Sequence, residues 1–120
     1  MKGDFMKIKV GVFFGGESVE HEISIISANQ AMKALNPEKY EVIPVYLSKK
    51  REWYTGEALL NIKNYKNMDQ LLSRCQRIHI IGNEGKIQLE PYPAKLFRTK
   101  PINTIDVALP VIHGTNGEDG

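Results

Sequence analysis

The hydrophobic and polar positions of the first part of the chain follow two different periods. Residues 8–14 begin with alternation and end in a continuous apolar run (IKVGVFF), which is typical of a strand covered on both faces. Apolar residues then recur every three or four positions from Val19 to Leu35, which predicts a helix of about 18 residues after an N-cap at Ser18. Residues 42–47 form a second apolar run. Strand, helix and strand at this spacing predict a right-handed βαβ unit with parallel strands.

The rest of the chain predicts shorter elements. The apolar residues within 59–75 predict one broken helix or two short ones. Residues 78–89 predict a β-hairpin, because two apolar stretches flank a Gly-Asn-Glu-Gly turn. After a proline-rich loop, residues 107–112 predict a last strand. Pro110 lies inside that strand and has no N–H to donate, so we expect the strand to lie at an edge of the sheet or to be irregular there.

Together these elements predict the α/β fold class, as a Rossmann-like, three-layer parallel sheet with a β-hairpin excursion that is truncated at its C-terminal side. The chain has 120 residues and ends on a glycine-rich loop, where an α/β protein normally begins the helix that covers the last strand. We therefore expect a longer molecule. A strand face that lacks its covering helix would stay partly exposed, which favours a homodimer.

Composition and charge exclude several classes of protein. The formal net charge is only +2, far from the concentrated positive field that binds a phosphate backbone, so no nucleic acid is expected as a partner. Cys75 is the only cysteine, which excludes an intrachain disulfide and suits a reducing compartment. No apolar stretch approaches the roughly 20 residues of a membrane helix. We therefore expect a cytoplasmic location and no membrane partner.

Two loops that follow strands carry candidate chemistry, and the first is residues 15–22 (GGESVEHE). The G-x-G-x-x-G spacing of a dinucleotide site is absent and three carboxylates crowd the turn, so we expect no nucleotide there. Carboxylates at a helix N-terminus are stabilised by backbone N–H groups, remain ionised and can receive a cation such as an ammonium group. Glu20 is the best candidate for this role. Ser24 follows it by one helical turn, on the same helix face.

The second loop is residues 113–120 (HGTNGEDG). If the last strand is parallel to the first, both loops emerge at the same edge of the sheet, where open α/β sheets bind ligands. His113 could then supply a hydrogen bond or a proton near neutral pH. One histidine and two acids make a weak metal signal, so no metal site is expected. Each candidate also has a structural interpretation: an ordinary first-turn acid for Glu20, a bond to its own helix for Ser24 and a satisfied strand-end residue for His113.

The segment from Val12 to Ser24 (VFFGGESVEHEIS), followed about ninety residues later by residues 113–120, closely resembles the N-terminal part of the D-alanine–D-alanine ligases. The resemblance implies that residues 1–120 are the N-terminal, substrate-binding (pre-ATP-grasp) domain, and that the central and C-terminal ATP-grasp domains are absent. In that family, ATP phosphorylates the carboxylate of one D-alanine. The amine of a second D-alanine then attacks the acyl phosphate and gives the dipeptide for peptidoglycan, and hence for cell wall biogenesis and cell shape.

The resemblance also implies roles for individual residues. Glu20 matches the catalytic acid that holds the ammonium of the first D-alanine, and His113 matches a histidine that lines the same pocket. Ile23 and Ser24 match substrate-site neighbours on the helix. ATP and Mg²⁺ are bound by the later domains of the family, so no cofactor or metal is expected in this chain. We expect the ATP-grasp domains of the same full-length protein and D-alanine as partners, and no ligase activity from these residues alone.

Three alternatives stay open at this stage. The chain could lead another ATP-grasp carboxylate–amine ligase, which the sequence beyond Gly120 would reveal. It could be a non-catalytic small-ligand-binding α/β domain of the receiver type, although Phe13 and Phe14 stand where a phosphoacceptor site needs acids. It could also be a structural dimerisation module. The second substrate is likewise open among D-alanine, D-lactate and D-serine.

Overall fold

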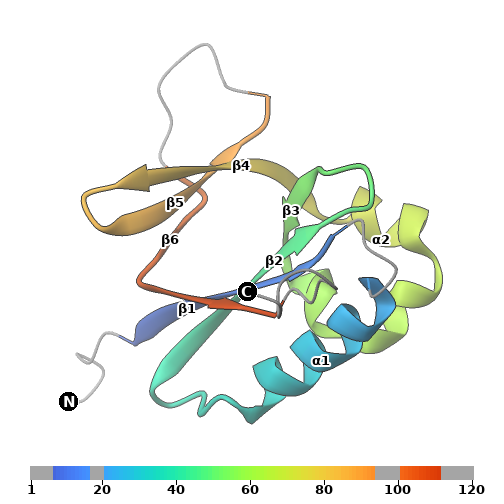
Figure 1. Ribbon diagram of the computed structural model, residues 1–120, viewed down its shortest axis with the longest axis horizontal. Helices are drawn as coiled ribbons and strands as arrows, with labels where there is room; N and C mark the ends of the chain where they lie inside the picture. Colours follow the sequence, from blue (N-terminus) through green and yellow to red (C-terminus); the bar gives the residue numbers. More distant parts are fainter. Residues whose placement is uncertain (1–6, 17–20, 94–100, 112–120) are drawn as a thin grey trace, which may run out of the picture.

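The computed structural model describes residues 7–16, 21–93 and 101–111. They form a mixed α/β fold with one seven-stranded sheet in the order β6-β5-β4-β3-β2-β1-β7 (Figure 1). In chain order, the elements are β1 (Ile8–Gly15), α1 (His21–Ala34), β2 (Tyr40–Leu47), β3 (Trp53–Thr55), the 3₁₀ helices η1 (Glu57–Leu60) and η2 (Ile62–Lys66), α2 (Met68–Ser73), β4 (Gln76–Asn83), β5 (Lys86–Pro91), β6 (Asn103–Ile105) and β7 (Val107–Pro110). None of the helices described here is long and apolar enough to cross a membrane.

The parallel part of the sheet is built around β1. On one side β1 pairs with β2, where Val10 lies opposite Val42, and on the other side it pairs with β7, where Val10 lies opposite Val107. Both pairings are parallel, so the predicted βαβ unit is confirmed. The edge position predicted from Pro110 is also confirmed, since β7 ends the strand order. A proline is tolerated there because no further strand needs its missing N–H.

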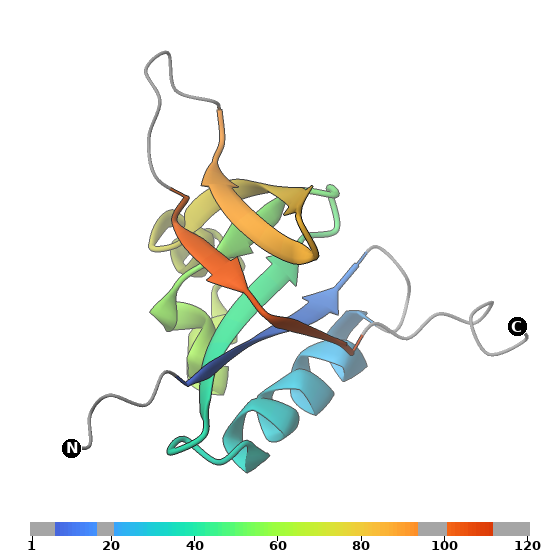
Figure 2. The same cartoon turned by 90° about the vertical axis from the view of Figure 1, so that its left-hand side faces the viewer.

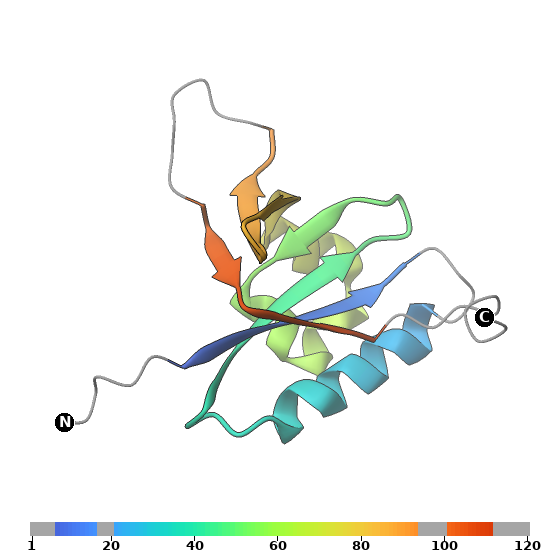
Figure 3. The ribbon, with the colours of Figure 1, turned by 60° about the vertical axis from the view of Figure 1, so that its left-hand side comes forward.

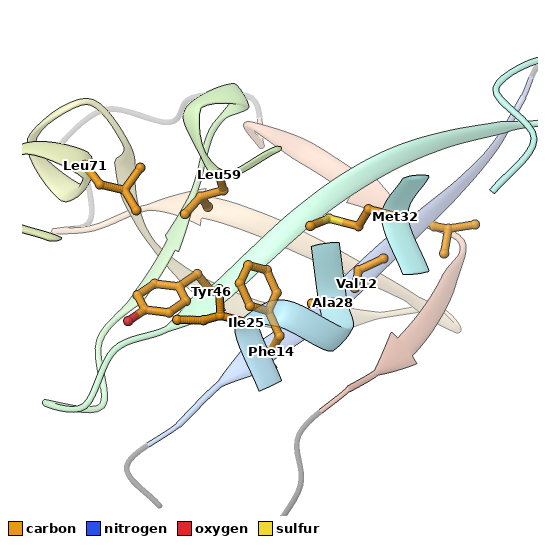
Figure 4. Packing of buried hydrophobic residues seen from close by; sticks show 9 residues of the cluster. Val12, Phe14, Ile25, Ala28, Met32, Tyr46, Leu59 and Leu71 are labelled. Carbon is orange, nitrogen blue, oxygen red and sulfur yellow. The ribbon is translucent and has the colours of Figure 1, made fainter. Parts of the chain in front are cut away.

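Helix α1 covers one face of the parallel strands, together with η1 and α2 (Figures 1 and 4). The buried arc of α1 is centred on Ile25, Ala28 and Met32, which pack on the strand residues of the same cluster. Ile23 and Ile26 belong to the apolar periodicity but are 57% and 52% exposed. They project beyond the arc that a single sheet face can cover, so periodicity alone does not separate them from the core.

The opposite face of the parallel strands is covered by the sheet itself. Strands β3 to β6 are antiparallel, and they curl back so that β6 crosses β1 (Figure 2). Ile105 of β6 belongs to one buried cluster with Ile43 and Val45 of β2. A Cβ on Gly11 would overlap the Ile105 side chain, so glycine is required for this close crossing. The α/β class and the hairpin are confirmed. The hairpin continues the sheet, and in the described part of the chain the layer on this face consists of strands.

Asp106 is the single residue that connects β6 to β7. Its backbone N–H donates to the Lys9 carbonyl at 2.8 Å, and its carboxylate accepts from the Lys9 N–H at 2.9 Å. The Lys86 ammonium lies 2.9 Å from the other carboxylate oxygen. The Lys9 backbone bond, followed by the Lys86 contact, lowers the pKa of the Asp106 carboxyl. The ionised form therefore holds the crossing strand against β1.

This geometry predicts how acid affects stability. Because the pKa of Asp106 is lower in the folded state, its contribution is fully present above its unfolded value of about 4 and is lost as the pH falls through the folded value. We expect Asp106→Asn to flatten the dependence of the unfolding free energy on pH in this acid range. Urea unfolding followed from neutral pH into acid tests this. Asp69→Asn removes an exposed acid from α2 and is the matched control. An unchanged acid limb in Asp106→Asn would contradict the assignment.

Candidate functional site

The carboxyl ends of the three parallel strands meet at one edge of the sheet (Figure 3). These strands end at Gly15, Leu47 and Pro110. The first candidate loop (residues 15–22) begins at Gly15, the last residue of β1, and the second (residues 113–120) comes shortly after Val111. The condition set by the sequence, that the last strand is parallel to the first, is therefore confirmed, and both loops start from the same edge. Glu20 and His113 lie outside the described residues, so their roles stay predictions.

Two glycines carry β1 into the first loop. Gly15 and Gly16 have φ values of 103° and 106°, a region that side chains disfavour. The Gly16 N–H donates to the Leu47 carbonyl at 2.8 Å, which ties the end of β1 to the end of β2. A Cβ on Gly15 would overlap that same Leu47 oxygen and lie 3.0 Å from the ring of Tyr46. The sharp exit from β1 therefore depends on glycine.

Ser24 connects helix α1 to two strands. Its side chain is fully buried (0% exposed), and its hydroxyl accepts from the Gly15 N–H at 2.9 Å and donates to the Val111 carbonyl at 2.6 Å. Both of these bonds leave the helix, unlike the bond to its own helix that is common for serine. Its neighbour Ile23 is more than half exposed. Ser24 and Ile23 are the predicted site residues that the structure describes. Ser24 is buried, whereas Ile23 is exposed.

A cavity of about 680 Å³ opens beside the end of β2, and Ser24 is not among the residues that line it. It is bounded by α1, the turn after β2, η2 and α2, and charged side chains of both signs line it. Its described lining residues are Glu22, Ile25, Ile26, Tyr46, Ser48, Lys49, Lys50, Glu52, Tyr54, Ile62, Tyr65, Lys66, Met68, Asp69 and Leu72. The cavity lies at the sheet edge where α/β proteins bind ligands.

Tyrosine hydroxyl groups distinguish the inner part of this cavity. Burial raises the pKa of Tyr46 to about 12 and also raises the pKa of Tyr65. An ordinary tyrosine is already protonated at neutral pH, and burial disfavours the ionised form of these two hydroxyls further. The Tyr65 hydroxyl donates to the Leu59 carbonyl at 2.8 Å, and the Tyr54 hydroxyl donates to the Glu52 carboxylate at 2.9 Å.

The hydrophobic pattern of the sequence does not reveal this cavity. Its walls come from α1, β2 and the helices around residues 62–72, which the sequence separates. A signal was available in the tyrosines: Tyr46 ends an apolar strand, and Tyr54 and Tyr65 follow it. A tyrosine places a polar tip on an apolar body, which suits the wall of a cleft. Strand periodicity alone assigns Tyr46 to the core.

The described residues contain no group of three or more His, Cys, Asp or Glu side chains that could hold a metal ion. The turn after β1 begins with Gly15 and Gly16 and lacks the G-x-G-x-x-G spacing of a phosphate site. The described residues therefore offer neither a carboxylate cluster for Mg²⁺ nor a glycine-rich phosphate loop for ATP.

The fold defines a class of protein: an α/β domain in which parallel strands end at one shared edge of the sheet, the edge where open α/β sheets bind ligands. The family described as the D-ala D-ala ligase N-terminus matches residues 9–120. The chain therefore belongs to the family of D-alanine–D-alanine ligase N-terminal domains, as the two loops predicted.

Curated relatives and solved structures agree with this assignment. The chain is 42% identical over 113 residues to the D-alanine–D-alanine ligase of Thermosipho melanesiensis, with 94% of the chain covered. It is 37% identical over 114 residues to the ligase of Bacillus cytotoxicus, with 95% covered. In each case the chain spans about 30% of the relative's length.

Among solved structures, the D-alanine–D-alanine ligase from Coxiella burnetii superposes with a TM-score of 0.67 at 26% identity, covering 95% of this chain and 31% of that one. A D-Ala:D-Ser ligase from Enterococcus faecalis superposes with a TM-score of 0.64 at 28% identity, covering 96% and 32%. The matched fold is the N-terminal part of these enzymes.

Proposed function

We propose that this chain is the N-terminal, substrate-binding domain of an ATP-dependent D-alanine–D-alanine ligase, and that it binds the first D-alanine. The observation that carries the proposal is the parallel pairing of β7 with β1, because it starts both candidate loops from one sheet edge. The family assignment supports it. ATP and Mg²⁺ belong to the ATP-grasp domains of the full-length protein, which would supply the phosphorylation of the substrate carboxylate.

In this proposal each site residue has a distinct task. Glu20 receives the ammonium of the first D-alanine, since an acid at a helix N-terminus remains ionised. His113 lines the same pocket from the second loop, and Ile23 contributes an apolar neighbour on α1. The carboxylate of the substrate is then left free to face the ATP-grasp domains, where the transferred phosphoryl group is stabilised.

Exposed apolar side chains indicate surfaces that partners would cover. Ile23 and Ile26 project from α1, and Val107 and Leu109 lie on the edge strand β7 at 50% and 36% exposure. The later domains of the same protein, or a second copy in a homodimer, would bury such groups. We expect the assembled enzyme to work in the cytoplasm, where the dipeptide for the cell wall is made.

The experiment compares two purified proteins, the full-length product of the reading frame and residues 1–120. Each is incubated with ATP, Mg²⁺ and D-alanine, and phosphate and D-alanyl-D-alanine are measured. We expect the full-length product to release phosphate together with dipeptide, and residues 1–120 to release neither, because the groups that stabilise the transferring phosphoryl group are missing. Phosphate release that requires a different amino acid would instead support another ATP-grasp ligase. D-serine and D-lactate, offered with D-alanine, determine the second substrate.

A further inference from the structure

The strongest unassigned feature lies between β1 and β7, where the ladder that joins them ends. In a parallel ladder, a residue donates its N–H to one residue of the neighbouring strand and accepts, through its carbonyl, from the residue two positions further on. Val111 follows the first half of this pattern, because its N–H donates to the Phe13 carbonyl at 2.7 Å. The next bond of the series would join the Gly15 N–H to the Val111 carbonyl.

Ser24 takes the place of that bond. The Gly15 N–H donates instead to the Ser24 hydroxyl at 2.9 Å, and the hydroxyl in turn donates to the Val111 carbonyl at 2.6 Å. A hydroxyl has one proton to donate and lone pairs that accept, so it can relay a hydrogen bond in this way with both partners satisfied. The Ser24 side chain is fully buried. Its bond to Gly15 is buried, and its bond to Val111 is partly buried.

We infer that Ser24 is a positioning residue whose hydroxyl acts as a spacer between the carboxyl ends of β1 and β7. The inference rests on the proposed function, because the first loop, with Glu20, follows the β1 end, and the second loop, with His113, follows the Val111 end. By occupying the last position of the ladder, the hydroxyl holds the two strand ends apart and in a defined register. It thereby sets the separation at which the two loops begin, and so the width available to the first D-alanine.

Removal of the hydroxyl leads to one of two structures, and either one disturbs the site. Either the Gly15 N–H closes directly onto the Val111 carbonyl and narrows the gap, or the buried Gly15 N–H and the partly buried Val111 carbonyl each lose a partner. In each case the strand ends shift relative to one another. A shift of this kind changes substrate binding more than the later phosphoryl transfer, because the reacting groups for that step are supplied by the other domains.

The test uses the full-length protein and three variants. Ser24→Ala removes the hydroxyl, and Ser24→Cys keeps a side chain of similar size with a poor hydrogen-bonding group. Thr55→Val is the matched control. The buried hydroxyl of Thr55, in β3, also donates to a strand carbonyl at 2.6 Å. That carbonyl belongs to Pro44, which lies within β2 and away from its carboxyl end. Initial rates of phosphate release give KM for D-alanine and kcat, and thermal unfolding gives Tm.

We expect Ser24→Ala and Ser24→Cys each to raise KM for D-alanine about tenfold while kcat changes less than about threefold, as expected for misplaced binding groups. Thr55→Val and both Ser24 variants are expected to lower Tm by about the same amount, a few degrees. Thr55→Val is nevertheless expected to leave KM for D-alanine within about twofold of the wild type. Wild-type KM in Ser24→Cys, or equal changes of KM in Ser24→Ala and Thr55→Val, would overturn the inference while the proposed function stands. A wild-type protein that releases no phosphate with D-alanine would overturn both.

Discussion

Gly15→Ala is expected to destabilise the fold by about 4 kcal/mol, the sum of a disfavoured backbone region and a clash with backbone atoms. Gly15 has a φ of 103°, and the added Cβ would overlap the Leu47 carbonyl oxygen and lie 3.0 Å from a ring carbon of Tyr46. The Leu47 oxygen cannot move aside easily, because it also accepts the Gly16 N–H. Urea unfolding of wild-type and variant proteins measures the difference.

Two other glycines separate the contributions to that loss. Gly85 has a φ of 81° but open space around its Cα, so Gly85→Ala reports the backbone term alone, about 1 kcal/mol. Gly82 has open space as well, and its φ lies outside the positive region that side chains disfavour. Gly82→Ala is therefore expected to change the free energy of unfolding by only a few tenths of a kcal/mol. If Gly15→Ala lowers the free energy of unfolding no more than Gly85→Ala does, the predicted clash between residue 15 and the end of β2 is wrong.

Glu20→Gln is expected to raise KM for D-alanine by about 10- to 100-fold in the full-length enzyme. A hydrogen bond to a charged group contributes about 1.5–3 kcal/mol, and each 1.4 kcal/mol is a factor of ten. Glutamine keeps the size of the side chain and removes the negative charge, so the loss reports the pairing with the substrate ammonium. Phosphate release at varied D-alanine concentration gives KM and kcat.

The control for this prediction is Glu41→Gln, which removes the same charge from an exposed position near the amino end of β2. It is expected to leave KM for D-alanine unchanged within about twofold. An equal rise in both variants would mean that net charge, and not a specific contact, controls binding. An unchanged KM in Glu20→Gln would remove Glu20 from the substrate site, and the resemblance in the first loop would then have no functional meaning for that residue.

The main elements of the fold could be predicted from the sequence because their hydrophobic patterns are strong. β1 and β2 each contain a long apolar run, and the α1 residues Ile25, Ala28 and Met32 recur at helical spacing. The hairpin is also predictable, because two apolar stretches flank a Gly-Asn-Glu-Gly turn. In the structure, Glu84 and Gly85 of this turn have the two positive φ values that tight hairpin turns need. These features depend on residues close together in the chain, so a local pattern records them.

Strand β6 and the curl of the sheet could not be predicted in this way. β6 has only three residues, too few to show a period. It forms because Leu89 of β5 lies opposite Asn103 and because Gly11 of β1 leaves room for Ile105. Each of these partners is distant in the sequence. The exposed positions of Ile23 and Ile26 have the same origin, because a single sheet face covers only part of the helix.

By itself, the sequence determined the local elements, the two loops that contain the candidate site residues Glu20 and His113, and membership of the D-alanine–D-alanine ligase N-terminal family. Only the tertiary structure decided that β7 lies parallel to β1, that the cavity is walled by tyrosines of separate elements, and that the Ser24 hydroxyl bridges Gly15 and Val111. The reason is physical. Periodicity records which side of an element is buried, whereas the partner of a buried polar group is chosen by packing between residues as far apart as Ser24 and Val111.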